Sequence, residues 1–247
     1  MKVQFDGSGD VVVITGGANG IGRALALAVS VAGAQAVVCD MDDAAMAEVK
    51  SLDARIDVRK LDVSNREQVQ AVFADIEATH GSIDGLVCGA AIQPRTLIHE
   101  MDAAEWDRVI GVNLNGVVWC YQAAVPGMIK RRRGSVVAFS SGLANQGWAK
   151  ASAYAATKAG LIAFLKSAAK EVAEHRVRVN VIWPGVIDTP QYRQANPGAD
   201  NESWKNTLGV GTAEDVVGPL MFLLSDAATM TASALTREMA YSKDTDA

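Results

Sequence analysis

A tyrosine and a lysine placed four residues apart are the first feature of this sequence that could do chemistry. Tyr154 and Lys158 fall in an alanine-rich segment, and Ser141 precedes them at the end of a stretch, residues 134–141, that reads as a strand. Side chains four apart on a helix share a face, with Cβ atoms roughly 5 to 6 Å apart. We therefore expect the ammonium group to lower the tyrosine pKa by about 1 to 3 units. A phenolate formed in this way can act as a general base.

The spacing of Tyr154 and Lys158 also arises by chance, so its position in the chain matters. A β-branched apolar run at residues 11–15 is followed by glycines at 16, 17, 20 and 22, and a helical pattern opens at Arg23. The amino end of such a helix offers unpaired amide groups to a pyrophosphate, and glycines let the backbone approach it closely. This pattern indicates dinucleotide binding, although glycine turns also occur in proteins that bind no nucleotide.

An acidic residue, Asp40, ends the second strand-like run. It lies at about the separation from the glycine turn at which a carboxylate meets the adenosine ribose. A carboxylate there accepts hydrogen bonds from both ribose hydroxyls of NAD. It opposes the 2′-phosphate of NADP, because like charges roughly 4 Å apart repel by about 4 kcal/mol at an effective dielectric constant near 20. The sequence therefore favours NAD, with an ordinary turn aspartate as the alternative.

The length and composition agree with one α/β domain over residues 1–247, with helices on both faces of a parallel sheet. Of the 247 residues, 49% are apolar and 21% charged, enough to cover both faces of such a sheet. Apolar runs alternate with helical periodicity. The predicted strands are 11–15, 35–39, 55–61, 83–88, 134–141 and 176–182, and the predicted helices are 20–32, 65–79, 101–130, 152–174 and 213–225.

The charge and the apolar pattern exclude several classes of partner. A net charge of -5 argues against a nucleic acid or an anionic membrane as partner, since both bind basic surfaces. The basic run at 130–133 is interpreted as the solvated end of a helix. No apolar run is long enough to span a membrane and no secretory leader is visible, so we expect a cytoplasmic protein.

Cysteines and histidines give no sign of a metal site. Cys39, Cys88 and Cys120 lie in apolar runs, so we expect buried free thiols and no disulfide or metal cluster. The three histidines, His80, His99 and His175, are scattered along the chain and are interpreted as surface or structural residues.

Taken together, these motifs resemble the short-chain dehydrogenase/reductase family over residues 8–226. The residues that carry the resemblance, in the family's order and spacing, are Thr15, Gly16, Gly20, Gly22, Asn113, Ser141, Tyr154, Lys158 and the segment 184–189. The resemblance implies a single-domain, doubly wound parallel sheet of the Rossmann type. It further implies hydride transfer between a nicotinamide cofactor and an alcohol or carbonyl substrate. It also implies a homodimer or homotetramer built on the long helices expected at 101–130 and 152–174.

The resemblance assigns a role to each matched residue. Tyr154 exchanges the substrate proton, Lys158 lowers the tyrosine pKa and binds the nicotinamide ribose, Ser141 donates a hydrogen bond to the substrate oxygen, and Asn113 orders the proton relay. The expected cofactor contacts are Gly16, Asn19, Gly20, Ile21, Gly22, Asp40, Asp62, Val63, Ala90, Tyr154, Lys158, Pro184, Gly185, Val186, Ile187 and Thr189. The expected substrate contacts are Ser141, Leu143, Gln146, Trp148 and Tyr154, with further walls from Gln93, Pro94, Val186 and a loop segment at 190–211 that contains Tyr192 and Trp204.

The chain departs from the family pattern at two places. The family's Asn-Asn-Ala-Gly after the fourth strand is here Cys88, Gly89, Ala90 and Ala91, so the hydrogen bonds of those asparagines are missing. The segment 234–240 stands where the family has a glycine-containing seventh strand, and we expect a shorter strand there.

Four functions fit the sequence to different degrees. The first is an NAD(H)-dependent oxidoreductase that interconverts a secondary alcohol and a ketone. The second is an NADPH-dependent reductase of 3-oxoacyl thioesters, which requires Asp40 to turn away. The third is a methyltransferase, in which Ser141, Tyr154 and Lys158 would have no role. The fourth is a non-catalytic dinucleotide sensor, for which the altered segment after the fourth strand is the best support.

Overall fold

The sheet at the centre of the fold is parallel and has seven strands in the order β3-β2-β1-β4-β5-β6-β7. The computed structural model describes residues 3–199 and 210–237. The strands are β1 (Val11–Thr15), β2 (Gln35–Asp40), β3 (Asp57–Lys60), β4 (Gly85–Cys88), β5 (Gly134–Phe139), β6 (Val177–Trp183) and β7 (Ala234–Thr236). The strand order reverses between β1 and β4, and ligands of open parallel sheets bind at such a point. The predicted doubly wound architecture is confirmed.

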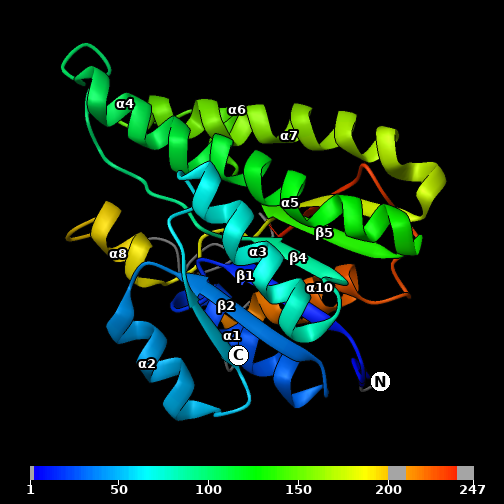
Figure 1. The fold of residues 1–247 in the computed structure, drawn as a ribbon. Helices are drawn as coiled ribbons and strands as arrows, with labels where there is room; N and C mark the ends of the chain where they lie inside the picture. Colours follow the sequence, from blue (N-terminus) through cyan, green and yellow to red (C-terminus); the bar gives the residue numbers. More distant parts are fainter. Residues whose placement is uncertain (1–2, 200–209, 238–247) are drawn as a thin grey trace.

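Helices cover both faces of this sheet. They are α1 (Gly20–Val31), α2 (Asp43–Leu52), α3 (Arg66–His80), α4 (Ala103–Ile110), α5 (Gly116–Arg131), α6 (Leu143–Gln146), α7 (Ser152–Val172), α8 (Pro190–Ala195) and α10 (Glu214–Leu224). Figure 1 shows α3, α5 and α7 on one side of the strands and α1, α2 and α10 on the other. Phe73 of α3 and Leu161 of α7 belong to one buried cluster, and Leu25 of α1 and Leu220 of α10 to the other. The central strands are therefore covered by apolar side chains on both faces, as a buried parallel sheet requires.

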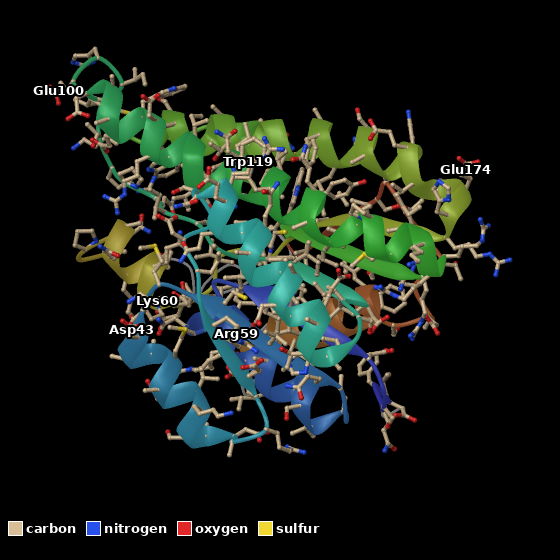
Figure 2. All side chains as sticks on the ribbon, viewed as in Figure 1. Asp43, Arg59, Lys60, Glu100, Trp119 and Glu174 are labelled. Atoms are coloured by element: carbon tan, nitrogen blue, oxygen red, sulfur yellow. The ribbon has the colours of Figure 1, made fainter. Side chains whose placement is uncertain are left out.

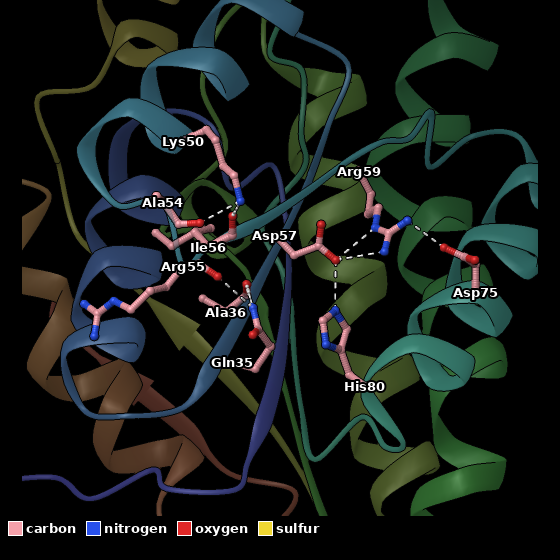
Figure 3. Close-up of polar contacts among 10 residues, drawn as sticks. All are labelled: Gln35, Ala36, Lys50, Ala54, Arg55, Ile56, Asp57, Arg59, Asp75 and His80. Atoms are coloured by element: carbon pink, nitrogen blue, oxygen red, sulfur yellow. Dashed lines mark hydrogen bonds and ion pairs between the residues drawn. The ribbon is translucent and has the colours of Figure 1, made fainter.

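Charged side chains protect the edge strand β3. Asp57 accepts hydrogen bonds from Arg59 and lies 2.9 Å from the His80 ring nitrogen, and Arg59 also pairs with Asp75 of α3 at 2.6 Å (Figure 3). Lys60 pairs with Asp43 of α2 at the same edge (Figure 2). This network ties β3 to the neighbouring helices, and charge on an edge strand opposes pairing with another chain.

The structure differs from the predicted elements at several places. The short helices α6 and α8 were not predicted, and the expected loop at 190–211 is wrong for its first six residues, which form α8. α2 was not predicted, because only Ala45, Met46 and Val49 of its short sequence are buried and the apolar periodicity is weak. The single helix predicted at 101–130 is α4, a π-helical turn (Gly111–Asn115) and α5. The strand predicted at 134–141 ends at Phe139, so Ser141 lies in the loop beyond β5. The short C-terminal strand is confirmed as β7.

Candidate active site

The turn between β1 and α1 has the shape that a bound pyrophosphate needs. Gly16 and Gly20 have positive φ angles of 66° and 50°. A Cβ atom on Gly22 would lie 2.3 Å from the Gly16 carbonyl oxygen, and one on Gly16 would lie 2.6 Å from the Ala90 nitrogen. The N-cap residue of α1, Asn19, makes no side-chain cap hydrogen bond, so the first amide groups of the helix remain available to an anion. These residues fit a dinucleotide.

A cleft of about 640 Å³ opens from this turn over the carboxyl ends of β2, β4 and β5 toward α7. The expected cofactor residues that line it are Gly16, Asn19, Gly20, Ile21, Gly22, Asp40, Asp62, Val63, Ala90, Tyr154, Lys158, Pro184 and Thr189. The other three, Gly185, Val186 and Ile187, are not among the lining residues, and Ile187 instead forms a bridge with Gly211. Most of the expected cofactor set is thus brought to one cavity.

Asp40 is held rigidly at the rim of this cleft. One carboxylate oxygen accepts from the Ala18 amide at 3.1 Å, and the other accepts from the amides of Met41 at 2.8 Å and Asp42 at 3.2 Å. The end of β2 therefore presents a fixed negative charge beside the glycine turn.

The altered segment after β4 still packs closely on the glycine turn. The Gly89 amide donates to the Thr15 carbonyl at 3.0 Å, and a Cβ atom on Gly89 would lie 2.8 Å from that oxygen. A backbone hydrogen bond thus joins the end of β1 to the residue after β4, at the place where the resembled family pattern has asparagine side chains. Across the cleft, Gln191 of α8 donates to the Ala91 carbonyl at 3.1 Å.

Two of the four candidate catalytic side chains, Tyr154 and Lys158, line the end of the cleft, and Ser141 lies next to them without lining it. The Lys158 ammonium nitrogen lies 5.5 Å from the centre of the Tyr154 ring and donates to the Phe139 carbonyl at 2.8 Å. The Ser141 and Tyr154 side chains are hydrogen-bonded to each other. The geometry therefore brings together the groups that the sequence pattern selected.

The expected lowering of the Tyr154 pKa is wrong. Burial raises the pKa of Tyr154 to about 12, and the hydrogen bond from Ser141 and the charge of Arg95 only partly oppose this effect. Burial also lowers the pKa of Lys158 to about 8. The ammonium group is bonded to the Phe139 carbonyl. Sequence spacing predicts the proximity of the two groups but not how strongly burial disfavours both of their charged forms.

The two adjacent serines have different surroundings. Ser140 is buried, and its hydroxyl donates to the Lys158 carbonyl at 2.9 Å, which ties α7 to the end of β5. Ser141 is half-buried, and its oxygen accepts from the Leu143 amide at 3.2 Å in addition to its contact with Tyr154. Ser141 is therefore the serine that is available to a substrate.

Asn113 lies fully buried in the π-helical turn between α4 and α5. Its side-chain oxygen accepts from the Ile92 amide and its nitrogen donates to the Ile92 carbonyl, both at 2.8 Å. The same nitrogen lies 3.4 Å from the Thr157 hydroxyl of α7. Asn113 thus joins α7, the helix that carries Tyr154 and Lys158, to the start of the loop after β4.

The expected substrate contacts are only partly grouped. Leu143 and Gln146 lie on α6, and Trp148 is 64% exposed beyond it; none of these three lines the cofactor cleft. Trp204 and the rest of 200–209 lie outside the described residues. One residue that the sequence did not single out, Arg95, acts on the pKa of Tyr154 and contacts α8. The sequence did contain a signal for Arg95, because it is a positively charged residue directly after Gln93 and Pro94, which were expected to line the substrate pocket.

Neither a metal site nor a membrane span is found within residues 3–199 and 210–237. No group of histidine, cysteine and acidic residues in these ranges could hold a metal ion. Cys39, Cys88 and Cys120 are buried free thiols, as expected. Among the helices of the same ranges, none combines the length and the apolar character needed to cross a bilayer.

Comparison with known proteins decides the family. Residues 10–200 match the family model described as short chain dehydrogenase. The chain belongs to the short-chain dehydrogenase/reductase family. A 3-oxoacyl-[acyl-carrier-protein] reductase, FabG, of Thermotoga maritima is 38% identical over 88% of this chain and 91% of its own length. The cis-4-hydroxycyclohexanecarboxylate dehydrogenase of Sinomonas cyclohexanicum is 35% identical over 91% of this chain and 93% of its own.

Solved structures agree with this assignment. The crystal structure of levodione reductase matches this short-chain dehydrogenase with a TM-score of 0.84 and 29% identity, over 95% of this chain and 97% of that one. The glucose/ribitol dehydrogenase of Brucella melitensis gives a TM-score of 0.87 and 28% identity over the same shares. The fold and the oxidoreductase class are therefore those of the family.

Proposed function

We propose that this short-chain dehydrogenase uses NAD(H) to interconvert a secondary alcohol and a ketone. The observation that carries the choice of cofactor is the Asp40 carboxylate, which three backbone amides hold at the rim of the cleft. A carboxylate at this place accepts hydrogen bonds from the ribose hydroxyls of NAD and repels the 2′-phosphate of NADP.

Two cations on neighbouring elements already have carboxylate partners. Arg23 of α1 pairs with Glu48 at 2.6 Å, and Lys60, the register partner of Asp40 on β3, pairs with Asp43. Each pairing weakens the attraction of the cation for a 2′-phosphate. The charge distribution at this end of the cleft therefore supports NAD.

The residues at the other end of the cleft support acid–base chemistry. The bound nicotinamide would supply or accept a hydride at the substrate carbon. Tyr154 removes the hydroxyl proton during oxidation and returns it to the carbonyl oxygen during reduction. Lys158 would bind the nicotinamide ribose, and Ser141 donates a hydrogen bond to the substrate oxygen where charge develops.

A second candidate is reduction of 3-oxoacyl thioesters with NADPH. It is supported by the 38% identity to the Thermotoga maritima reductase. Steady-state comparison of NADH with NADPH separates the two proposals, because a preference for NADPH together with turnover of a 3-oxoacyl thioester would favour the second.

The test of the proposed function is a panel of alcohols and ketones followed by NADH absorbance. We expect wild-type turnover of at least one secondary alcohol or ketone, and a loss of about 100-fold or more in kcat for Tyr154→Phe. The dissociation constant of NADH should change little in the same variant, since the ring remains. Full activity of Tyr154→Phe would refute the acid–base assignment, and binding of NADH without any turnover would favour the dinucleotide sensor.

A further inference from the structure

Arg237, the residue after β7, is bonded to the end of β6. Its amide donates to the Trp183 carbonyl at 2.8 Å, and its Nη1 donates to the Pro184 carbonyl at 3.1 Å. β7 pairs in parallel with β6, and Trp183 and Thr236 are the last register partners. The half-buried arginine side chain therefore extends the contact between the two strands onto the segment that follows β6, residues 184–189.

A second set of contacts holds the same segment. The Gly211 amide donates to the Val186 carbonyl at 2.9 Å, and the Asp188 amide donates to the Gly211 carbonyl at 2.9 Å. A Cβ atom on Gly211 would lie 3.3 Å from an Asp215 carboxylate oxygen and 3.7 Å from the Arg237 Nη1, so these two charged groups flank Gly211. Arg237 and Gly211 thus hold the backbone of the segment from two neighbouring positions.

The two ends of the segment 184–189 line the cofactor cleft. One end, Pro184, follows β6 beside the end of β5, where the Lys158 ammonium group is bonded. The other end, Thr189, lies against the glycine turn, because a Cβ atom on Gly20 would be 3.0 Å from the Thr189 Cγ2. A dinucleotide with its pyrophosphate at that turn and its reacting carbon beside the candidate catalytic tyrosine must therefore place its nicotinamide half along this segment.

We propose that Arg237 is a positioning residue for the nicotinamide half of the cofactor. By holding the Pro184 carbonyl, it keeps the segment 184–189 in the shape that this half binds. Such pre-organisation lowers the cost of ordering a segment when a ligand binds. The assignment rests on the proposed function only in so far as that function places a nicotinamide dinucleotide in the cleft. The segment 234–240, where the chain departs from the family pattern, thereby acts on cofactor binding through its arginine.

The experiment measures the dissociation constants of NADH and ADP-ribose by titration calorimetry, which needs no substrate. ADP-ribose has the adenosine, the pyrophosphate and the second ribose of NADH and lacks the nicotinamide. We expect the wild type to bind NADH more tightly than ADP-ribose. Arg237→Met should weaken NADH binding by about 3- to 10-fold, the range of one hydrogen bond, and leave ADP-ribose binding unchanged. Arg237→Lys keeps the charge without the planar group, so it should show a smaller loss for NADH alone.

Arg178→Met is the matched control. Arg178 lies at the other end of β6 and also donates to backbone carbonyls, those of Leu223 and Leu224. Its replacement removes bonds of the same kind away from the segment 184–189, so both dissociation constants should keep their wild-type values. A loss for NADH alone in this control would show that any weakening of β6 has the same effect, and would overturn the assignment to Arg237.

The comparison of the two ligands separates positioning from general support of the fold. Equal weakening of both ligands in Arg237→Met, or unchanged binding of NADH, would overturn the assignment. Equal affinity of the wild type for both would overturn it too, and would leave the role of Asp40 intact. Retained ADP-ribose binding shows that a variant is folded, and Arg237→Lys carries the test if Arg237→Met does not fold. Failure to turn over any alcohol or ketone would reject the proposed reaction alone, because this experiment measures binding.

Discussion

Replacement of Asp40 tests how the chain selects its cofactor. Asp40→Asn removes the negative charge and keeps a side-chain oxygen for the amides of Ala18, Met41 and Asp42, whereas Asp40→Ala removes both. We expect both variants to bind NADPH more tightly and NADH less tightly than the wild type. The asparagine variant isolates the effect of charge.

The size of the effect follows from the position of the carboxylate. Two like charges 4 Å apart repel by about 1 kcal/mol in water and about 4 kcal/mol at an effective dielectric constant of 20. Asp40 is half-buried at the rim of the cleft, which places it between these limits. A change of about 1.4 to 2.8 kcal/mol corresponds to roughly 10- to 100-fold in the ratio of the two dissociation constants.

The assay is titration of each variant with NADH and NADPH by cofactor fluorescence, which needs no substrate. Asp42→Asn is the matched control, because it removes a nearby negative charge while asparagine still caps α2. The gain for NADPH should shrink as salt is added, since mobile ions screen a charge at the rim. Unchanged selectivity in Asp40→Asn, or an equal shift in Asp42→Asn, would refute the reasoning.

Three further perturbations probe the frame of the site. Asn113→Leu should lower the free energy of unfolding in urea by about 2 to 4 kcal/mol, because two backbone groups lose their partner; a change below about 0.5 kcal/mol would contradict this. Burial lowers the pKa of Lys158 to about 8, and an unfolded lysine keeps its proton to about pH 10.4. Between these pH values the unfolded chain binds more protons than the folded one, so the contribution of Lys158 to the free energy of unfolding rises with pH. This contribution should be absent in Lys158→Met and present in Lys166→Met, a variant on the same helix. Gly22→Ala places a Cβ atom 2.3 Å from a backbone oxygen and should weaken NADH binding by about tenfold or more, whereas Gly218→Ala, with open space around it, should leave binding unchanged.

Much of the site could be predicted because its residues are defined by local spacing. Tyr154 and Lys158 share a helix face, and the glycine turn and Asp40 belong to consecutive elements of one β-α-β unit. The family resemblance added Asn113 and Ser141, which are distant in sequence. The parallel sheet followed from strands that are apolar along their whole length, as in β1, where all five residues are buried.

What could not be predicted depends on contacts between distant segments and on burial. Arg95 meets Ala195 and Asn196 across separations of 100 and 101 residues, and no local pattern specifies that contact. The pKa of Tyr154 depends on the balance between burial and nearby charges, which the spacing to Lys158 does not contain. The π-helical turn also escaped a periodicity argument, because one extra residue per turn barely disturbs the apolar pattern of a long helix.

Asn113 is hydrogen-bonded to both the amide and the carbonyl of Ile92, and this anchor divides the loop after β4 into two parts that tolerate substitution differently. Upstream of that point, Gly89 is packed closely on β1 through its bond to the Thr15 carbonyl and tolerates little replacement. Downstream, Arg95 contacts the end of α8. Residues after Ile92 can therefore be replaced without touching the bonds that hold Ile92 to Asn113, which makes this stretch the natural target for a directed-evolution library.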